Sequence, residues 1–251
     1  MLSLIKFKLH TGENDFSLNM ASLFHGYLSK TIDPDYANSM HMTGLHPYSQ
    51  CITQECDSYY WTVTTLNKEA FQSIIKPLKD IKKVVLTKKE LEIPIECIEE
   101  KQITYAQLFE QNYFNTQSSN YIKLLFESPT SFKADGKYIN MPSSSRILAS
   151  LVRKYDAFSS STQISDKMLE EHILNNTDIS SYSLRSCSFA LEGVKIPSFK
   201  GSLTIRTFGS KTFSCFVNML ADFAEYSGCG IKTGIGMGKT KHIKREVDTV
   251  E

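Results

Sequence analysis

The sequence of 251 residues has no apolar run of membrane-spanning length, and its first residues, MLSLIKFKLH, alternate too regularly for a signal peptide. Its six cysteines form no CxxC pair and show no Cys/His spacing typical of zinc sites. The formal net charge is only +1, which by itself argues against a protein coated in nucleic acid. These absences predict a soluble cytoplasmic chain with reduced thiols, without a metal site and without a membrane partner.

The sequence also lacks a complete nucleotide-binding motif, although the segment GCGIKTGIGMGKTK at residues 228–241 suggests one. A P-loop requires a glycine where this chain has Thr233, and the dinucleotide fingerprint needs its third glycine at the same position. Only eleven residues follow Thr240, which leaves little room for the helix that both motifs use to hold phosphate. No cofactor is therefore predicted.

What the sequence does contain is an ordinary globular composition, with 41% hydrophobic and 22% charged residues. The basic charge is local, because the window from Lys232 to Arg245 holds five lysines and arginines and no acidic residue. Glycines allow a backbone to approach phosphate closely, and interleaved lysines supply charge. The segment therefore indicates binding to the backbone of RNA, unless it is only a turn with solvated lysines.

The hydrophobic pattern predicts an α+β fold made of two similar halves. In the first half we expect strands at 5–10, 47–53, 59–66 and 82–86, with helices at 19–30, 35–42 and 68–75. This βαββαβ order is the ferredoxin-like plan. The second half repeats it, with a strand at 122–126, an Asp135-Gly136 hairpin, a helix at 145–155 and strands at 182–194 and 201–208.

The clearest predicted helix follows Ser210, which can cap its start, and ends at Gly228. The glycine-rich segment then leads into a last strand. We place the domain boundary in the polar stretch NTQSSN. The N-terminal domain is then expected at residues 1–117 and the C-terminal domain at 118–251.

Five segments in the right order resemble one known family: FHGYLSK, DPDYANSMHMTGLHPYSQ, RILASLVRKYDAF, FKGSLTIRTFG and ADFAEYSGCGIKTGIGMGK. They are similar to segments of the CRISPR-associated repeat-processing endoribonucleases, the sixth Cas family within the repeat-associated mysterious protein superfamily. The resemblance implies two tandem ferredoxin-like domains, with a C-terminal glycine-rich loop that binds CRISPR repeat RNA. It also allows a homodimer, or membership of a multisubunit guide-RNA effector complex.

The resemblance further implies cleavage without metal, in which the ribose 2′-OH attacks the neighbouring phosphorus and leaves a 2′,3′-cyclic phosphate and a 5′-OH. Such chemistry needs a base, an acid and a cation, and histidine suits both proton transfers. YANSMH resembles a family segment that carries the catalytic histidine, which makes His41 the first choice. His46 is the second, and Lys154 is the expected cation.

Several alternatives remain open at this point. Among the histidines, His25 completes a group of three within 22 residues of sequence. Arg153 and Lys30 compete with Lys154 for the role of the cation, and Tyr27 or Tyr48 can also take part. The predicted RNA-binding residues are Arg153, Gly228, Gly230, Lys232, Gly234, Gly236, Gly238, Lys239 and Lys241.

The rival interpretation is a non-catalytic subunit of the same superfamily that only holds guide RNA. It would share the double fold and the glycine-rich loop, but it would need no histidine pair. The closeness of His41 and His46 favours the nuclease.

Overall fold

A computed structural model describes residues 1–12, 16–37, 44–114, 118–159 and 163–244. The predicted helix at 35–42 is described only over residues 34–37, where the Asp33 carboxylate accepts hydrogen bonds from the amides of Asp35 and Tyr36. His41 therefore lies outside the described residues. None of the helices in the described ranges is long and apolar enough to cross a membrane.

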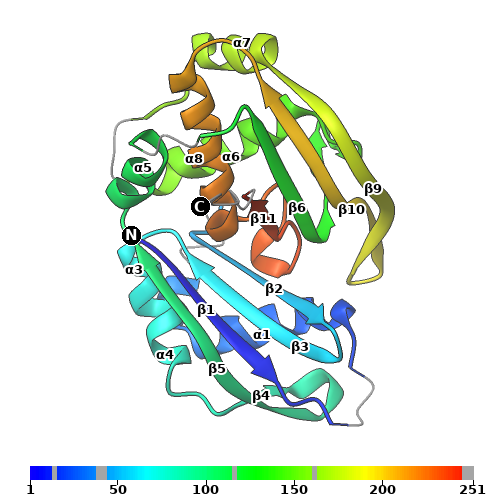
Figure 1. Ribbon diagram of the computed structural model, residues 1–251. Coiled ribbons are helices and arrows are strands. Elements are labelled where there is room, and N and C mark those ends of the chain that lie inside the picture. Colours follow the sequence, from blue (N-terminus) through cyan, green and yellow to red (C-terminus); the bar gives the residue numbers. More distant parts are fainter. Residues whose placement is uncertain (13–15, 38–43, 115–117, 160–162, 245–251) are drawn as a thin grey trace, which may run out of the picture.

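The N-terminal half forms one five-stranded antiparallel sheet in the order β2-β3-β1-β5-β4 (Figure 1). Its strands are β1 (Leu2–Leu9), β2 (Tyr48–Glu55), β3 (Ser58–Thr65), β4 (Lys83–Leu86) and β5 (Leu91–Ile103). Helix α1 (Ala21–Thr31) and a continuous helical segment, α3 (Lys68–Ala70), η2 (Phe71–Ile75) and α4 (Lys76–Leu78), pack on the sheet.

The fourth strand of the ferredoxin-like plan differs from the one expected at 82–86. That segment is the edge strand β4, whereas β5 pairs with β1 from Leu2↔Ile103 to Leu9↔Ile95. Strand β5 was not predicted, because its second half, CIEEKQI, is largely exposed and has no apolar alternation. Its position depends on a pairing with the distant β1, which local sequence does not encode.

The C-terminal half forms a four-stranded sheet in the order β11-β6-β10-β9, which is the ferredoxin-like order. Its strands are β6 (Tyr121–Thr130), β9 (Thr177–Leu191), β10 (Val194–Thr207) and β11 (Thr240–Ile243). Helices α6 (Ser144–Phe158) and α8 (Lys211–Ser227) bury their apolar faces against it. The Ser210 hydroxyl accepts from the Phe213 amide at 3.2 Å, and α8 ends at Gly228, as the sequence predicts.

The predicted hairpin at Asp135-Gly136 is present between β7 (Phe132–Ala134) and β8 (Lys137–Ile139). Two further helices were not predicted, α5 (Tyr105–Tyr113) and α7 (Lys167–Asn176). The predicted boundary near residue 118 falls between α5 and β6. The division into 1–117 and 118–251 remains a prediction, because the two cores share elements.

The two halves contact each other through buried side chains. Phe189 and Ile196 from the β9-β10 hairpin and Met237 from the glycine-rich segment belong to the core of the N-terminal sheet. The Tyr226 carbonyl near the end of α8 accepts hydrogen bonds from the hydroxyls of Ser49 and Thr64 on β2 and β3. These contacts fix the end of α8, and the segment that follows it, against the N-terminal sheet.

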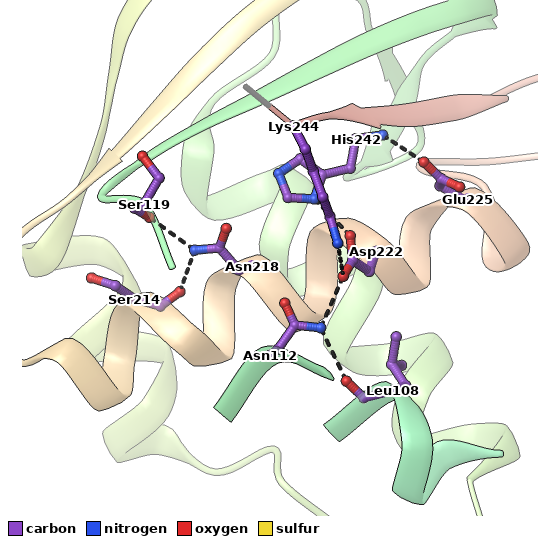
Figure 2. A network of polar contacts seen from close by, with 9 residues as sticks. All are labelled: Leu108, Asn112, Ser119, Ser214, Asn218, Asp222, Glu225, His242 and Lys244. Atoms are coloured by element: carbon purple, nitrogen blue, oxygen red, sulfur yellow. Dashed lines mark hydrogen bonds and ion pairs between the residues drawn. The ribbon is translucent and has the colours of Figure 1, made fainter. Parts of the chain in front are cut away.

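A buried polar network ties α5 to the C-terminal strand (Figure 2). Asp222 on α8 lies at its centre and bonds to three side chains: His242 Nδ1 at 2.7 Å, Asn112 Nδ2 at 2.8 Å and Lys244 Nζ at 3.0 Å. Burial alone would raise the pKa of Asp222, but His242, Lys244 and Asn112 together hold it below its ordinary value. The charged carboxylate is thus the form that this network stabilises.

Candidate active site

The glycine-rich loop, residues 228–239, connects α8 to β11 and lies between the two sheets (Figure 1, orange-red). It contains one short helical turn, η4 (Thr233–Ile235). Gly228, Gly230, Gly234, Gly236 and Gly238 are all buried, so the loop is a packed element and not the exposed turn that its composition suggests.

Several amides of the glycine-rich loop already have acceptors within the protein. Gly230 N donates to Ser150 Oγ at 2.9 Å, Gly238 N to the Pro129 carbonyl at 3.0 Å, and Gly228 N to the Ala224 carbonyl at 2.9 Å. We expected glycine amides to hold phosphate. For these three positions the structure shows another use, because their N–H groups hold the loop in place.

Two glycines allow the loop to pack against the N-terminal half. A Cβ built on Gly234 would lie 3.2 Å from Tyr48 Cζ, closer than side chains normally approach. Gly236 has a φ of +118°, and a Cβ there would overlap the Cβ of Ala21 on α1. Gly236 therefore cannot be replaced without moving the loop away from α1, and Gly234 allows the loop backbone to approach Tyr48 on β2 closely.

Tyr48 brings two of the candidate histidines together below Gly234. Its hydroxyl lies 3.0 Å from His25 Nδ1, and its ring centroid lies 5.5 Å from that of His46. His25 comes from the middle of α1, whereas His46 precedes β2 by two residues. Burial raises the pKa of Tyr48, and nearby Tyr36 raises it further. Tyr48 is therefore a neutral phenol that orients its neighbours, not a base.

Two described residues, Tyr36 and His46, interact with Tyr48 from segments before and after residues 38–43. Tyr36 interacts electrostatically with Tyr48, and His46 packs against the Tyr48 ring. Of the other candidates, Tyr27 donates its hydroxyl to the Lys83 carbonyl on β4, and Lys30 is exposed at the end of α1. Neither has a contact with Tyr48 in the described structure.

Lys154, the predicted cation, is almost fully buried, with 3% of its surface exposed. Its ammonium donates to the Ser227 carbonyl at 2.7 Å, to Thr233 Oγ1 at 2.8 Å and to the Gly228 carbonyl at 3.4 Å. An ammonium has three N–H donors, so all of them have partners, one at the end of α8 and two in the glycine-rich loop. A direct bond to RNA would have to replace one of these contacts.

Arg153 is exposed, in contrast to Lys154, and lines a groove of about 800 Å³ between α6, α7 and β7. Lys133 and Arg146 add two further exposed cations to this groove, and Asp156 and Glu170 add two carboxylates. The Asp156 carboxylate accepts from the amides of Ile164 and Ser165, so it serves the local backbone. We call this surface the basic groove.

The basic groove extends to the glycine-rich loop, because Gly230 and Ile231 line it. Leu45 lines it as well, and His46 is the next residue in the chain.

The three predicted lysines of the glycine-rich segment have different surroundings. Lys239 is partly buried and its ammonium donates to the Glu225 carbonyl at 3.1 Å. Lys232 has a left-handed backbone with a φ of +54°, and Lys241 is exposed on β11. The segment is therefore not one continuous cationic surface, and the role of these lysines in RNA binding remains a prediction.

No group of three or more His, Cys, Asp or Glu side chains gathers into a possible metal site within the described ranges. The sequence analysis names His25 and Tyr48 as separate candidates, but it does not predict that they are in contact. The segments HGY and HPY each place a histidine close to a tyrosine, but only the packing of α1 on β2 brings His25 to Tyr48.

Comparison with known proteins assigns this fold to a class. A solved structure described as a RAMP protein that binds different RNA substrates aligns over 97% of the chain and 100% of its own length, with a TM-score of 0.62 and 14% identity. A Cas6 product complex aligns over 97% of this chain and 100% of that chain, with a TM-score of 0.79 and 22% identity. Cas6 of Thermus thermophilus aligns over 97% and 98%, with a TM-score of 0.73 and 19% identity. The fold is that of the RAMP proteins, with two tandem ferredoxin-like domains.

Sequence comparison identifies the family. The family model described as CRISPR-associated endoribonuclease Cas6 matches residues 124–240. The Cas6 endoribonuclease of Streptococcus thermophilus is 31% identical over 91% of this chain and 93% of its own length. That of Mycobacterium tuberculosis is 29% identical over 85% of this chain and 68% of its own. The chain belongs to the Cas6 family of CRISPR-associated endoribonucleases.

Proposed function

We propose that this protein cleaves CRISPR precursor RNA once within each repeat, without a metal ion, through attack of the ribose 2′-OH on the adjacent phosphorus. The observation that carries the proposal is that Tyr48 contacts His25, His46 and the glycine-rich loop at Gly234. Leu45, which directly precedes His46, lines the basic groove. Two imidazoles and the packed glycine-rich loop thus meet at one phenol. The products are a 2′,3′-cyclic phosphate and a 5′-OH.

In this mechanism His41 accepts the proton of the 2′-OH, and His46 protonates the departing 5′ oxygen. Histidine can do both near neutral pH, because its ordinary pKa is about 6.5. These roles are those implied by the family resemblance. The contact of His46 with the Tyr48 ring supports the role of His46. In this proposal Tyr48 and His25 do not transfer protons; the Tyr48 ring supports His46, and its hydroxyl bonds to His25.

The cation that balances charge on the phosphate is better supplied by Arg153 than by Lys154. Arg153 is exposed in the basic groove, whereas all three donors of Lys154 are used by the protein. An arginine can also bind phosphate with two parallel N–H groups. Apolar side chains, among them Phe132, Val152 and Ile173, also line the groove. Such a lining suits an unpaired or splayed RNA strand, because bases can lie against it.

Incubation of the full chain with repeat RNA in EDTA tests the mechanism. Cleavage is expected to continue, and the products should carry a cyclic phosphate and a 5′-OH. A substrate with one 2′-deoxy sugar at the cut should bind with unchanged affinity and resist cleavage, since its nucleophile is missing. Normal cleavage of the deoxy substrate, or a 3′-OH product, would refute the proposed attack.

The same experiment separates the enzyme from a subunit that only binds guide RNA. Tight binding of the unmodified repeat without any cleavage, in EDTA and with added magnesium, would favour the binding subunit. Membership of an effector complex and formation of a homodimer remain predictions.

A further inference from the structure

We infer that Lys154 is a positioning residue, which acts on the proposed reaction through the glycine-rich loop and Tyr48 without touching the RNA. The inference rests on the proposed function for its effect on rate, but the chain of contacts is independent of it. Lys154 lies on α6 of the C-terminal half, whereas Tyr48, His25 and His46 belong to the N-terminal half.

The first step of this chain is the bond from α6 to the loop. Lys154 Nζ donates to the carbonyl of Ser227 at the end of α8 and to that of Gly228 at the start of the glycine-rich loop. It also donates to the Thr233 hydroxyl in the middle of the loop. One ammonium thus bridges two points that are five or six residues apart in sequence. Ser150, one helical turn before Lys154, accepts from Gly230 N on the same face of α6.

The second step is the bond from the loop to the histidines. Thr233 is followed directly by Gly234, where an added Cβ would lie 3.2 Å from Tyr48 Cζ, so the loop backbone faces the Tyr48 ring there. Tyr48 in turn contacts His25 through its hydroxyl and His46 through its ring. Any shift of Thr233 that carries Gly234 with it therefore changes the surface against which Tyr48 and both imidazoles pack.

A buried lysine is costly to keep, which indicates a task for it. Burial lowers the pKa of Lys154 to about 7; the Cys229 thiol opposes this shift, and the charge of Arg153 adds to it. An apolar side chain of the same length would avoid the desolvation of an ammonium. An apolar side chain could not bond to the Ser227 and Gly228 carbonyls and the Thr233 hydroxyl. We therefore assign these three hydrogen bonds as the role of the lysine.

The test compares Lys154→Met with Lys211→Met, a control at the exposed start of α8. Single-turnover cleavage at saturating RNA removes differences in affinity. The rate of Lys154→Met is expected to fall about 10- to 100-fold, since a misplacement of about 1 Å can cost about 10²-fold. Lys211→Met should keep the wild-type rate.

The second readout is the titration of the histidine ring protons by NMR, without RNA. The midpoints of His25 and His46 are expected to change in Lys154→Met, whereas those of His10 and His172 should not. His10 is exposed beside Glu96, and His172 packs against Phe213, so both report on regions outside the contact chain. Unchanged midpoints for His25 and His46 would overturn the inference, even if the rate falls.

Thr233→Val keeps the shape of the loop and removes only one acceptor of the ammonium. It should shift the same two titrations in the same direction by a smaller amount, and it decides the question if Lys154→Met does not fold. Shifted titrations in a protein that cuts the 2′-deoxy substrate would sustain the contact chain and refute the proposed mechanism. A lowered rate of Lys154→Met with unchanged titrations of His25 and His46 would refute the contact chain and leave the proposed mechanism unaffected.

Discussion

The hydroxyl of Tyr48 lies 3.0 Å from Nδ1 of His25, which joins strand β2 to helix α1 at the place where the glycine-rich loop meets both. Burial raises the pKa of Tyr48, so the group that pairs with His25 Nδ1 is a neutral phenol. This hydrogen bond orients one imidazole and fixes the position of the phenol that supports the other.

Removal of the Tyr48 hydroxyl should weaken the reaction without unfolding the protein. Tyr48→Phe keeps the ring under Gly234 and the contact with His46, but it loses the bond to His25. A neutral hydrogen bond is worth about 0.5 to 1.5 kcal/mol, so we expect the single-turnover rate to fall about tenfold or less. Tyr27→Phe is the matched control, because the Tyr27 hydroxyl donates to the Lys83 carbonyl, outside the cluster. Equal rates for both variants would mean that the Tyr48 bond is only structural.

Substitution of the two histidines with proposed proton transfers should affect rate more than affinity. General acid and base catalysis is worth about 10²- to 10⁴-fold in rate. His41→Ala and His46→Ala are each expected to lose rate in this range and to bind RNA almost as the wild type does, because these groups act in the transition state. His10→Ala is the control. A modest loss for His46→Ala with a large one for His25→Ala would exchange their assignments.

The basic groove should contribute to affinity through phosphate contacts. Arg146→Ala combined with Arg153→Ala removes two exposed cations from its wall. Each phosphate of a single strand that a cation neutralises adds about 0.7 to the slope of log affinity against log salt. The double variant should therefore flatten this slope by about 1 to 2, measured by filter binding over a salt series. Lys211→Ala should leave it unchanged, and an unaltered slope for the double variant would place the RNA elsewhere.

Much of the fold could be predicted because its signals are local. Helix α8 has a serine cap, a regular apolar stripe and a terminal glycine, and each of these depends on a few neighbouring residues. The Asp135-Gly136 hairpin is equally local. Strand β5, by contrast, carries charged residues along an exposed face and is defined by its partner β1, which is distant in sequence.

The candidate site could be predicted by residue type more than by arrangement. Glycine and lysine content indicated an exposed phosphate-binding loop, but burial of the loop depends on contacts with Ala21 and Tyr48 that composition cannot reveal. A signal for Lys154 was present: it lies seven residues after Ile147 and three after Leu151, so it falls on the apolar stripe of α6. The spacing alone could place it inside the protein.

The last prediction concerns the network around Asp222, which couples the stability of the protein to pH (Figure 2). Bonds to His242, Asn112 and Lys244 hold the pKa of Asp222 below its ordinary value, although burial opposes them. In the unfolded chain this carboxyl should have the ordinary aspartate pKa of about 3.9. A carboxyl with a lowered folded pKa contributes stability above the unfolded pKa and loses it as pH falls through the folded pKa.

Asp222→Asn should therefore be destabilising at pH 7, and the loss should shrink only as the pH falls below about 3.9 and through the lowered folded pKa, where the wild-type carboxylate also becomes neutral. Hydrogen bonds to charged groups contribute about 1.5 to 3 kcal/mol, and we expect a loss of this size in the free energy of unfolding by urea at pH 7. Asp57→Asn, in the exposed turn between β2 and β3, is the control and should change it little. Asp222 holds His242 on β11, the strand that follows the glycine-rich loop. The RNA cleavage rate of Asp222→Asn at pH 7 therefore also tests whether cleavage depends on this attachment of the loop. An equal loss of stability at pH 7 and at a pH well below the folded pKa of Asp222 would show that the carboxylate charge contributes nothing and that Asp222 serves only by its shape.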